Sequence, residues 1–326
     1  LDDIMTYRLA RDRFMMVVNA ANADQDWAWL NAVNEGVVSV DREHPGRGLG
    51  VRAQLRNLKD PSSGDDRKVD LALQGPLSRL LLTGLAAGEA DRLRLWELRR
   101  TELCEVTLTG GLPLLVCRTG YTGEEWGYEI FVHPDRAREL WQLLLSYGGP
   151  LGLKPTGLGA RDSTRTEAGF PLYGHELGGP HDLVPAQAGY GAFVKRHKPF
   201  FIGRNPLLDR EEKLQTRVVR FRVVRKGARV IKPENPVVNY RGEVVGVVTS
   251  SAVVGDSGVQ YGLALIAGNQ SKVGSRLGIF AASRDMALPG KNLFSLTPGE
   301  RLPLPEDAEI MPRHYNPARE KIEESK

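Results

Sequence analysis

The hydrophobic pattern of the chain opens with short stretches typical of strands. Residues 4–9 and 14–18 are rich in bulky and β-branched side chains and flank a polar turn at 11–13, which predicts a β-hairpin. Asn22 or Asp24 is suited to cap a helix that continues through the apolar positions near residue 30 and stops at Gly36. Further strands are expected over 37–40 and 51–58, and 61–67 reads as loop.

The middle of the chain mixes strand pairs with single helices. Strands are predicted over 69–73, 105–109, 112–117 and 128–133, with helices after Gly75-Pro76, over 92–98 and from Pro134 onward. If Gly110-Gly111 is a two-residue hairpin turn, Cys104 falls opposite Cys117 and geometry would allow a disulfide, which we do not expect in a reducing compartment. The pattern predicts an α+β fold with sheets covered on one side.

The C-terminal part of the sequence has a different hydrophobic pattern. A short helix is expected to end near residue 209, and 211–215 resembles a linker. From residue 217, short apolar β segments are separated by Gly, Asn and Pro turns, which predicts a small β-barrel or sandwich. The last nine residues are highly charged, and we expect this tail to be frayed or disordered.

Composition narrows the class of protein. A chain of 326 residues with 41% hydrophobic and 26% charged residues is typical of a globular protein of two or three domains. No apolar run approaches the roughly 18 residues of a membrane span and no signal peptide is visible, so the expected location is the cytoplasm, with no membrane partner. The net charge of +4 favours acidic partners, but the basic residues are dispersed, so we expect no nucleic acid partner.

Metal and nucleotide sites have no support in the sequence. The two cysteines exclude a thiolate zinc cluster, and the six histidines show neither HxH nor HExxH spacing, so no metal is expected. Neither a dinucleotide-binding glycine motif nor a Walker A sequence occurs.

One polar stretch, GLGARDSTRTEAGFPLYGHE at 157–176, stands out. As a helix, it places Leu158, Arg161, Asp162 and Arg165 on one face. Such a stripe can be solvated or pair with itself. Alternatively, Asp162 holds an arginine that is offered to an anionic ligand, because guanidinium geometry matches carboxylates.

This stretch resembles the segment that marks glycine-cleavage T-proteins, the folate-dependent aminomethyltransferases. RTGYTGEEWGYEI (118–130), the opening LDDIMTYRL and FIGR (201–204) fall in the order of that family, so the resemblance covers nearly the whole chain. It implies T-protein-like folate-binding domains with ferredoxin-like β/α units, two intertwined α+β subdomains over 1–210, then a small β-barrel domain over 216–313 and a charged tail over 314–326. Members of the family carry a further upstream segment, so we expect this chain to be N-terminally truncated and not a competent enzyme as it stands.

The resemblance also suggests site residues. A carboxylate suits the paired donors of a pterin, an aromatic ring can stack on it, and an arginine can bind the benzoyl-glutamate end. By position in the motifs, Glu129 matches the pterin-binding glutamate, and Asp3 matches the acid that moves protons during one-carbon transfer. The remaining folate-binding candidates are Asn19, Tyr121, Arg161 and Tyr173.

The implied activity is a tetrahydrofolate-dependent aminomethyl transfer from a lipoyl carrier protein of the H-protein kind, with release of ammonia. A folate-dependent demethylase acting on another methylated donor is the alternative enzyme. A non-catalytic folate-binding paralogue ranks third, because such relatives carry KGCYxGQE where this chain has HKPFFIGR (197–204). Three departures from the family pattern are an apparent one-residue insertion at Trp126, and Thr164 and Thr166 at positions where leucine is usual.

Overall fold

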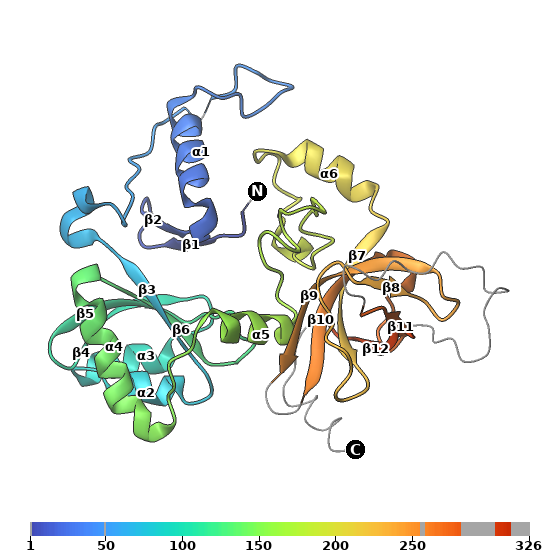
Figure 1. Cartoon of the computed structure of the whole chain (residues 1–326). Helices are drawn as coiled ribbons and strands as arrows, with labels where there is room; N and C mark the ends of the chain where they lie inside the picture. The colour runs from blue at the N-terminus through green and yellow to red at the C-terminus, as the bar shows by residue number, and fades with distance from the viewer. Residues whose placement is uncertain (1, 49, 255–257, 282–303, 314–326) are drawn as a thin grey trace. The chain divides into compact units, whose positions relative to one another are not determined.

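The computed structural model describes residues 2–48, 50–254, 258–281 and 304–313 (Figure 1). It forms two compact units, residues 2–161 and the part that begins at Asp162. The domain boundary expected near residue 210 stays a prediction, and the charged tail over 314–326 lies outside the described residues. Within the described ranges, no helix has both the length and the apolar character needed to cross a bilayer.

The first unit contains a two-stranded sheet, a four-stranded sheet and the helices between them. The antiparallel order of the larger sheet is β3-β6-β5-β4. The elements are β1 (Met5–Arg8), β2 (Phe14–Val17), α1 (Ala23–Glu35), β3 (Val69–Gln74), α2 (Ser78–Gly84), α3 (Glu89–Glu97), β4 (Leu103–Leu108), β5 (Leu112–Cys117), β6 (Gly127–Val132) and α4 (Pro134–Gly148). The predicted opening hairpin is confirmed, and α1 ends at Gly36 in the left-handed conformation, as expected.

Both faces of the four-stranded sheet are covered within this unit. Because side chains alternate along a strand, Leu114 and Val116 of β5 pack in the core that α2, α3 and α4 also line. Leu115 and Cys117 point to the opposite face and pack with Tyr7 and other residues of the β1–β2 hairpin. The sheet therefore carries the helices on one face and the hairpin on the other, where the sequence predicted cover on one face only.

Two expected strands of the first unit are absent from the described residues. Residues 37–40 and 51–58 form no ladder, and Val37 and Val51 are 70% and 83% exposed. Their β-branched composition favours a strand, but no strand of the described residues pairs with them, although Val40 is buried and Leu58 packs against the hairpin-side core. The expected loop over 61–67 instead contains a 3₁₀ segment, Pro61–Asp66, with a kink at Gly64.

The predicted register of the β4–β5 hairpin is wrong by one residue. Leu108 pairs with Leu112, so the turn has three residues and both Gly110 and Gly111 have positive φ. Cys104 therefore pairs with Val116 instead of Cys117, and a shift of one residue sends a side chain to the opposite face of the sheet. Both cysteines are free.

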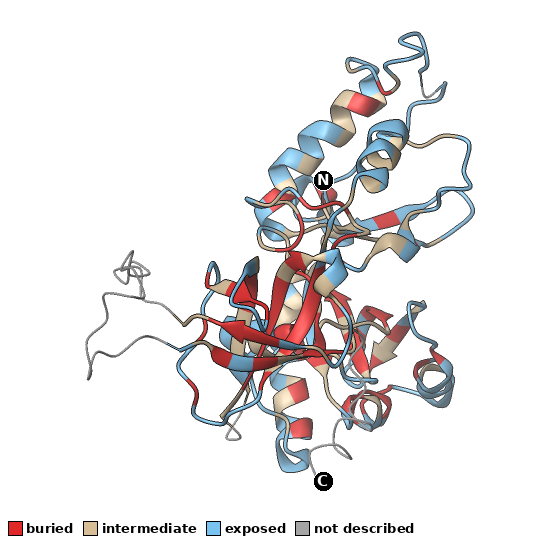
Figure 2. Cartoon of the chain, turned by 90° about the vertical axis from the view of Figure 1, so that its right-hand side faces the viewer, coloured by how far each residue is buried: buried red, intermediate tan, exposed pale blue. Residues whose placement is uncertain are grey.

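The second unit contains the predicted barrel. Six strands close in the order β10-β7-β12-β11-β8-β9. Its elements are α6 (Arg204–Glu212), β7 (Thr216–Val223), β8 (Pro236–Val238), β9 (Val244–Val254), β10 (Val259–Ala267), β11 (Arg276–Ile279) and β12 (Glu306–Met311), and α5 (Leu158–Ala168) crosses the division between the units. The helix α6 extends into the expected linker, and β12 was not predicted. Buried residues concentrate in the barrel strands and the four-stranded sheet (Figure 2), so the α+β class with a C-terminal barrel is confirmed.

Candidate functional site

Asp3 and Asn19 lie at the base of the β1–β2 hairpin, just before β1 and just after β2. The side-chain amide of Asn19 donates to Asp3 Oδ1 at 2.7 Å and to the Asp3 carbonyl at 3.1 Å. Burial raises the pKa of Asp3, while the Asn19 hydrogen bond and the charge of Arg161 oppose that rise. The hairpin thus brings two of the predicted residues into direct contact.

Glu129 lies on β6, on the face of the sheet that the hairpin covers. Its neighbours Tyr128 and Ile130 pack in the helix-side core, so the strand period directs Glu129 to the other face, together with Phe131. The hydroxyl of Tyr7, which is only 3% exposed, donates to Glu129 Oε2 at 3.4 Å. A glutamate on a strand is usually solvated, but the side chain of Glu129 is partly enclosed.

Electrostatics at Glu129 favour the neutral carboxyl. Burial and the nearby charge of Asp70 raise the pKa of Glu129, against the opposing effects of the Tyr7 hydroxyl and the Arg161 guanidinium. Burial also raises the pKa of the Cys117 thiol, beside Tyr7, to about 12. The thiol is therefore neutral at pH 7 and is not an available nucleophile.

Arg161 connects the predicted residues of the first unit. Its guanidinium lies 4.8 Å from the centre of the Tyr121 ring, a cation–π distance. The same charge lowers the pKa of both Asp3 and Glu129. A guanidinium next to two carboxyls of raised pKa and an aromatic face can hold an anionic, ring-containing ligand and move a proton.

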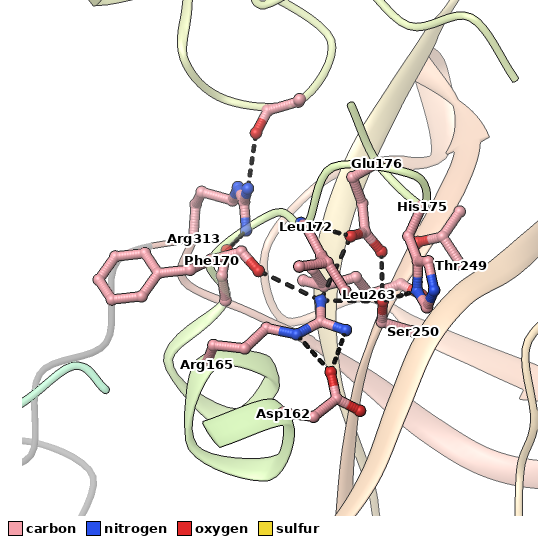
Figure 3. Close-up of polar contacts among 12 residues, drawn as sticks. Asp162, Arg165, Phe170, Leu172, His175, Glu176, Thr249, Ser250, Leu263 and Arg313 are labelled. Atoms are coloured by element: carbon pink, nitrogen blue, oxygen red, sulfur yellow. Dashed lines mark hydrogen bonds and ion pairs between the residues drawn. The ribbon is translucent and has the colours of Figure 1, made fainter. Parts of the chain in front are cut away.

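Tyr173 belongs to the second unit, in the turn after α5. Its side chain is half-buried. The same turn contributes Leu172 and Glu176 to a network centred on Arg165, which is 1% exposed (Figure 3). Arg165 donates to Asp162 Oδ1 at 2.6 and 2.8 Å, to Ser250 Oγ at 2.9 Å and to Glu176 Oε2 at 3.3 Å. Of the two readings of the polar helix face, self-pairing is therefore correct for Arg165, and its donors are not offered to a ligand.

The carboxylate of Glu176 completes this network. It accepts from the backbone N–H of Leu172 at 3.0 Å and from the hydroxyl of Ser250 at 2.6 Å. Because that hydroxyl gives its proton to Glu176, His175 Nδ1, 3.2 Å from the same oxygen, must carry the proton that it shares with Ser250. The motif at 172–176 thus ties α5 and its following turn to β9 of the barrel.

Sequence reasoning missed several members of both groups. Tyr7 was read only as a strand residue, although the alternation that buries it also faces it toward Glu129. Glu176 was noted as part of the motif but was given no role. Ser250 was not predicted, because it lies 85 residues from Arg165 in the sequence and no local pattern indicates their contact. Strand period predicts that Tyr7 is buried, and the cost of burying a lone arginine predicts a carboxylate partner for Arg165, but neither identifies the distant partner.

The structure shows what surrounds Trp126 and Thr166, two of the three departures from the family pattern. Trp126 packs against the helix-side core, with the guanidiniums of Arg118 and Arg79 3.6 and 4.3 Å from its ring centre. This stacking holds the segment before β6. Thr166 is fully buried, and within the described residues its hydroxyl has no hydrogen-bond partner.

One group of side chains in the first unit has spacing compatible with a cation. Ligand atoms of Asp41, Glu43 and His44 lie within 4.8 Å of one another, in a largely exposed loop. Arg47 already donates to Asp41 Oδ2 at 2.7 Å, which competes with any cation there. The absence of a resident metal stays a prediction.

Comparisons with known proteins agree with one another. The family model described as the GCVT N-terminal domain matches residues 1–198. An aminomethyltransferase of Desulfitobacterium hafniense (strain Y51) is 34% identical over 280 residues, 86% of this chain and 68% of that protein. An aminomethyltransferase of Caldanaerobacter subterraneus subsp. tengcongensis is 32% identical over 297 residues, 90% of this chain and 71% of that protein.

A solved structure gives the same result. The crystal structure of the glycine cleavage system aminomethyltransferase T from Bartonella henselae is 27% identical in sequence and matches with a TM-score of 0.65. The match covers 96% of this chain and 71% of that one.

Proposed function

The chain belongs to the aminomethyltransferase family of glycine-cleavage T-proteins, and from this premise we propose that it transfers a one-carbon unit to tetrahydrofolate. The donor is an aminomethyl group on the lipoyl arm of a carrier protein, and ammonia is released. The observation that carries the proposal is the convergence of Asp3, Glu129 and Arg161 in the first unit.

Glu129 is proposed to bind the pterin. The pterin amide N–H and 2-amino group are parallel donors, and a carboxylate is the acceptor that pairs with both. Tyr7 holds one oxygen of Glu129, which fixes the carboxyl plane. A bound pterin supplies hydrogen-bond donors to the ionised carboxylate of Glu129. The raised pKa of Glu129 therefore falls when the pterin binds.

Tyr121 and Arg161 are proposed to contact the rest of the folate. The tyrosine ring offers a face for stacking, and the guanidinium matches the carboxylates of the glutamate tail. Tyr173, in the second unit, is proposed as a further folate contact on the strength of its place in the motif. Asn19 is proposed as a folate contact on the same ground, beside Asp3, to whose Oδ1 its side-chain amide donates at 2.7 Å.

Asp3 is proposed as the catalytic residue. In the overall reaction the transferred carbon forms bonds to N5 and N10 of tetrahydrofolate, and its bonds to the lipoyl sulfur and to the amine nitrogen break. The two protons that leave the folate nitrogens go to the sulfur and to the departing ammonia. A carboxyl with a raised pKa beside these atoms can accept and return such protons.

The proposal is tested by an assay of tetrahydrofolate with an aminomethyl-lipoyl carrier protein, in which ammonia release and methylenetetrahydrofolate formation are measured together. We expect equal amounts of both products, and none without folate. A panel of methylated amines and sulfur compounds serves as the control for donor choice. One-carbon transfer from such a compound, with none from the lipoyl carrier, would contradict the proposal.

A further inference from the structure

Gln74, the last residue of β3, places its side chain on the face of the sheet that carries Glu129. Leu73, its neighbour on the strand, packs in the helix-side core, so the strand period directs Ala72 and Gln74 to the opposite face. Ala72 pairs with Glu129, and Gln74 pairs with Gly127. Gln74 therefore follows Ala72 on the face that is proposed to bind folate.

The side-chain amide of Gln74 crosses β6 and reaches the chain beyond the end of β5. Its nitrogen donates to the carbonyls of Tyr128 at 3.3 Å and of Thr119 at 3.2 Å. Its oxygen accepts from the hydroxyl of Thr122 at 3.2 Å. An amide nitrogen has two hydrogens, so both donors of Gln74 are used within the protein and neither is left for a ligand.

This amide takes the place of a strand ladder that ends here. Within the described residues, the β5–β6 ladder ends at the pair formed by Cys117 and Glu129. Beyond this pair, the amide of Gln74 joins the carbonyls of Tyr128 and Thr119. A side chain of β3 thus prolongs the connection between β6 and the chain that follows β5.

Two glycines leave room for the amide. A Cβ atom on Gly120 or on Gly127 would overlap the side chain of Gln74. Neither glycine has a positive φ, so the backbone conformation would allow another residue at both positions. The close approach of the Gln74 side chain is therefore what requires glycine there.

The loop that follows β5 carries Tyr121, the proposed stacking residue. Gln74 bonds this loop on both sides of the tyrosine, at the Thr119 carbonyl and at the Thr122 hydroxyl. The ring of Tyr121 has the guanidinium of Arg161 4.8 Å from its centre. The amide therefore restricts the backbone that sets the direction of this ring.

We propose that Gln74 is a positioning residue for folate binding, because its amide fixes the loop after β5 and so holds the ring of Tyr121 in place for the ligand. The contact of the ring with folate rests on the proposed function, but the fixing of the loop does not. Without the amide, the loop has to be ordered when the ligand binds, and this weakens binding. The chemical step does not depend on Gln74, because the three hydrogen bonds of its amide go to the loop and to β6 and not to Asp3.

The first test removes the amide. Gln74→Met nearly keeps the length of the side chain but loses its hydrogen bonds, and Gln142→Met, at an exposed position of α4, is the control. We expect Gln74→Met to raise the Kd and the KM for tetrahydrofolate roughly tenfold with kcat unchanged, and the control to match the parent. In a Tyr121→Ala background, Gln74→Met should not change the Kd further, because it acts through the missing ring. Unchanged affinity in Gln74→Met, or a loss that adds in full to that of Tyr121→Ala, would overturn the proposal.

Two variants of the loop test the same contact, even where Gln74→Met folds poorly. Thr122→Val removes the hydroxyl that donates to Gln74 Oε1, whereas Thr122→Ser keeps it. We expect Thr122→Val to weaken tetrahydrofolate binding roughly threefold and Thr122→Ser to bind like the parent. Equal affinities in the two variants would count against the role of the amide.

Hydrogen exchange of the full chain without ligand separates this inference from the proposed function. The backbone amides of residues 119–125 should exchange roughly tenfold faster in Gln74→Met than in the parent, and at the parent rate in Gln142→Met. That result is expected even if the chain binds no tetrahydrofolate, in which case the proposed function fails alone. Unchanged exchange in Gln74→Met would exclude the positioning role, whatever the chain binds.

Discussion

Two groups of this molecule hold similar side chains under opposite electrostatic conditions. One is the Arg165 network of the second unit, and the other is the Asp3–Glu129–Arg161 cluster of the first unit. In the network, a buried arginine meets two carboxylates, a hydroxyl and a backbone carbonyl, and Glu176 accepts from three donors. In the cluster, the pKa values of Asp3 and Glu129 are raised, chiefly by burial. The first arrangement is satisfied without a ligand, whereas the second favours one that brings donors.

The comparison is instructive because one helix contributes to both groups. Arg161 and Arg165 are four residues apart on α5, so helical spacing alone places both on one face. Arg161 lies against the ring of Tyr121, and its charge acts on the pKa of two carboxyls, whereas Arg165 is enclosed by its partners. Substitutions should therefore separate a stability role from a binding role along one helix.

The largest expected effect is on stability, from Arg165→Met. Removing the guanidinium leaves the Glu176 carboxylate buried without its counter-charge, which costs about 3–5 kcal/mol of unfolding free energy. Denaturant unfolding measures the loss. The control is Arg222→Met, whose partner Glu309 is 3.9 Å away and partly exposed, and for which we expect about 1 kcal/mol or less. Equal costs in the two variants would refute the distinction between buried and surface pairs.

The next effect is on turnover, from Asp3→Asn. The amide keeps the shape of the side chain but cannot exchange a proton, so kcat should fall by about 10²–10⁴ while tetrahydrofolate affinity is nearly unchanged. Steady-state kinetics together with calorimetric titration measures both. Turnover within a few-fold of the parent would show that Asp3 is only structural.

A smaller effect concerns Glu306 in the barrel, whose pKa is lowered. Burial acts to raise the pKa of Glu306, but hydrogen bonds from Arg229 and Arg225 outweigh it. Its contribution to stability is therefore present above its ordinary pKa of 4.5 and is lost as pH falls through the lower folded value. Glu306→Gln should cost about 1–2 kcal/mol at pH 7 and much less in acid. A cost independent of pH would contradict the ion-pair origin.

The smallest effect has the opposite sign, at Glu129. Its folded pKa is raised, so its favourable contribution exists below the ordinary value and is lost as pH rises through the folded pKa. At pH 7, where this carboxyl is ionised in the unfolded chain, the raised folded pKa therefore lowers the stability of the free protein. Glu129→Gln should raise the unfolding free energy by about 0.5–1 kcal/mol at pH 7, with the gain vanishing in acid. A variant less stable than the parent at pH 7 would exclude this account.

Much of the fold could be predicted from local pattern, and each error has a physical cause. The opening hairpin and α1 have periodicity and stop signals of their own, and the barrel segments are bounded by turn residues. The failures at 37–40 and 51–58 arose because strand composition does not ensure a partner strand. The one-residue error at Gly110-Gly111 arose because adjacent glycines fit turns of two or three residues equally well.

The candidate site was predictable only through motifs. Alternation alone places Glu129 on the hairpin side of the sheet once β6 is known, but no local pattern shows that Tyr7 lies opposite it, 122 residues away. The same holds for Asp2 and Asn22, whose side chains hydrogen-bond at 2.9 Å between the residues before β1 and the start of α1. Long-range contacts of this kind are decided by tertiary packing, which local periodicity does not encode.

The central claim is that Glu129 binds the pterin of tetrahydrofolate, and calorimetric titration of Glu129→Ala tests it most directly. Glu105→Ala is the matched control, because Glu105 pairs with Leu115 on the same face of the sheet but is exposed at the edge strand β4. We predict that Glu129→Ala weakens tetrahydrofolate binding by about 1–3 kcal/mol, since two pterin donors lose their acceptor, and that the control binds like the parent. Unchanged affinity in Glu129→Ala would contradict the account.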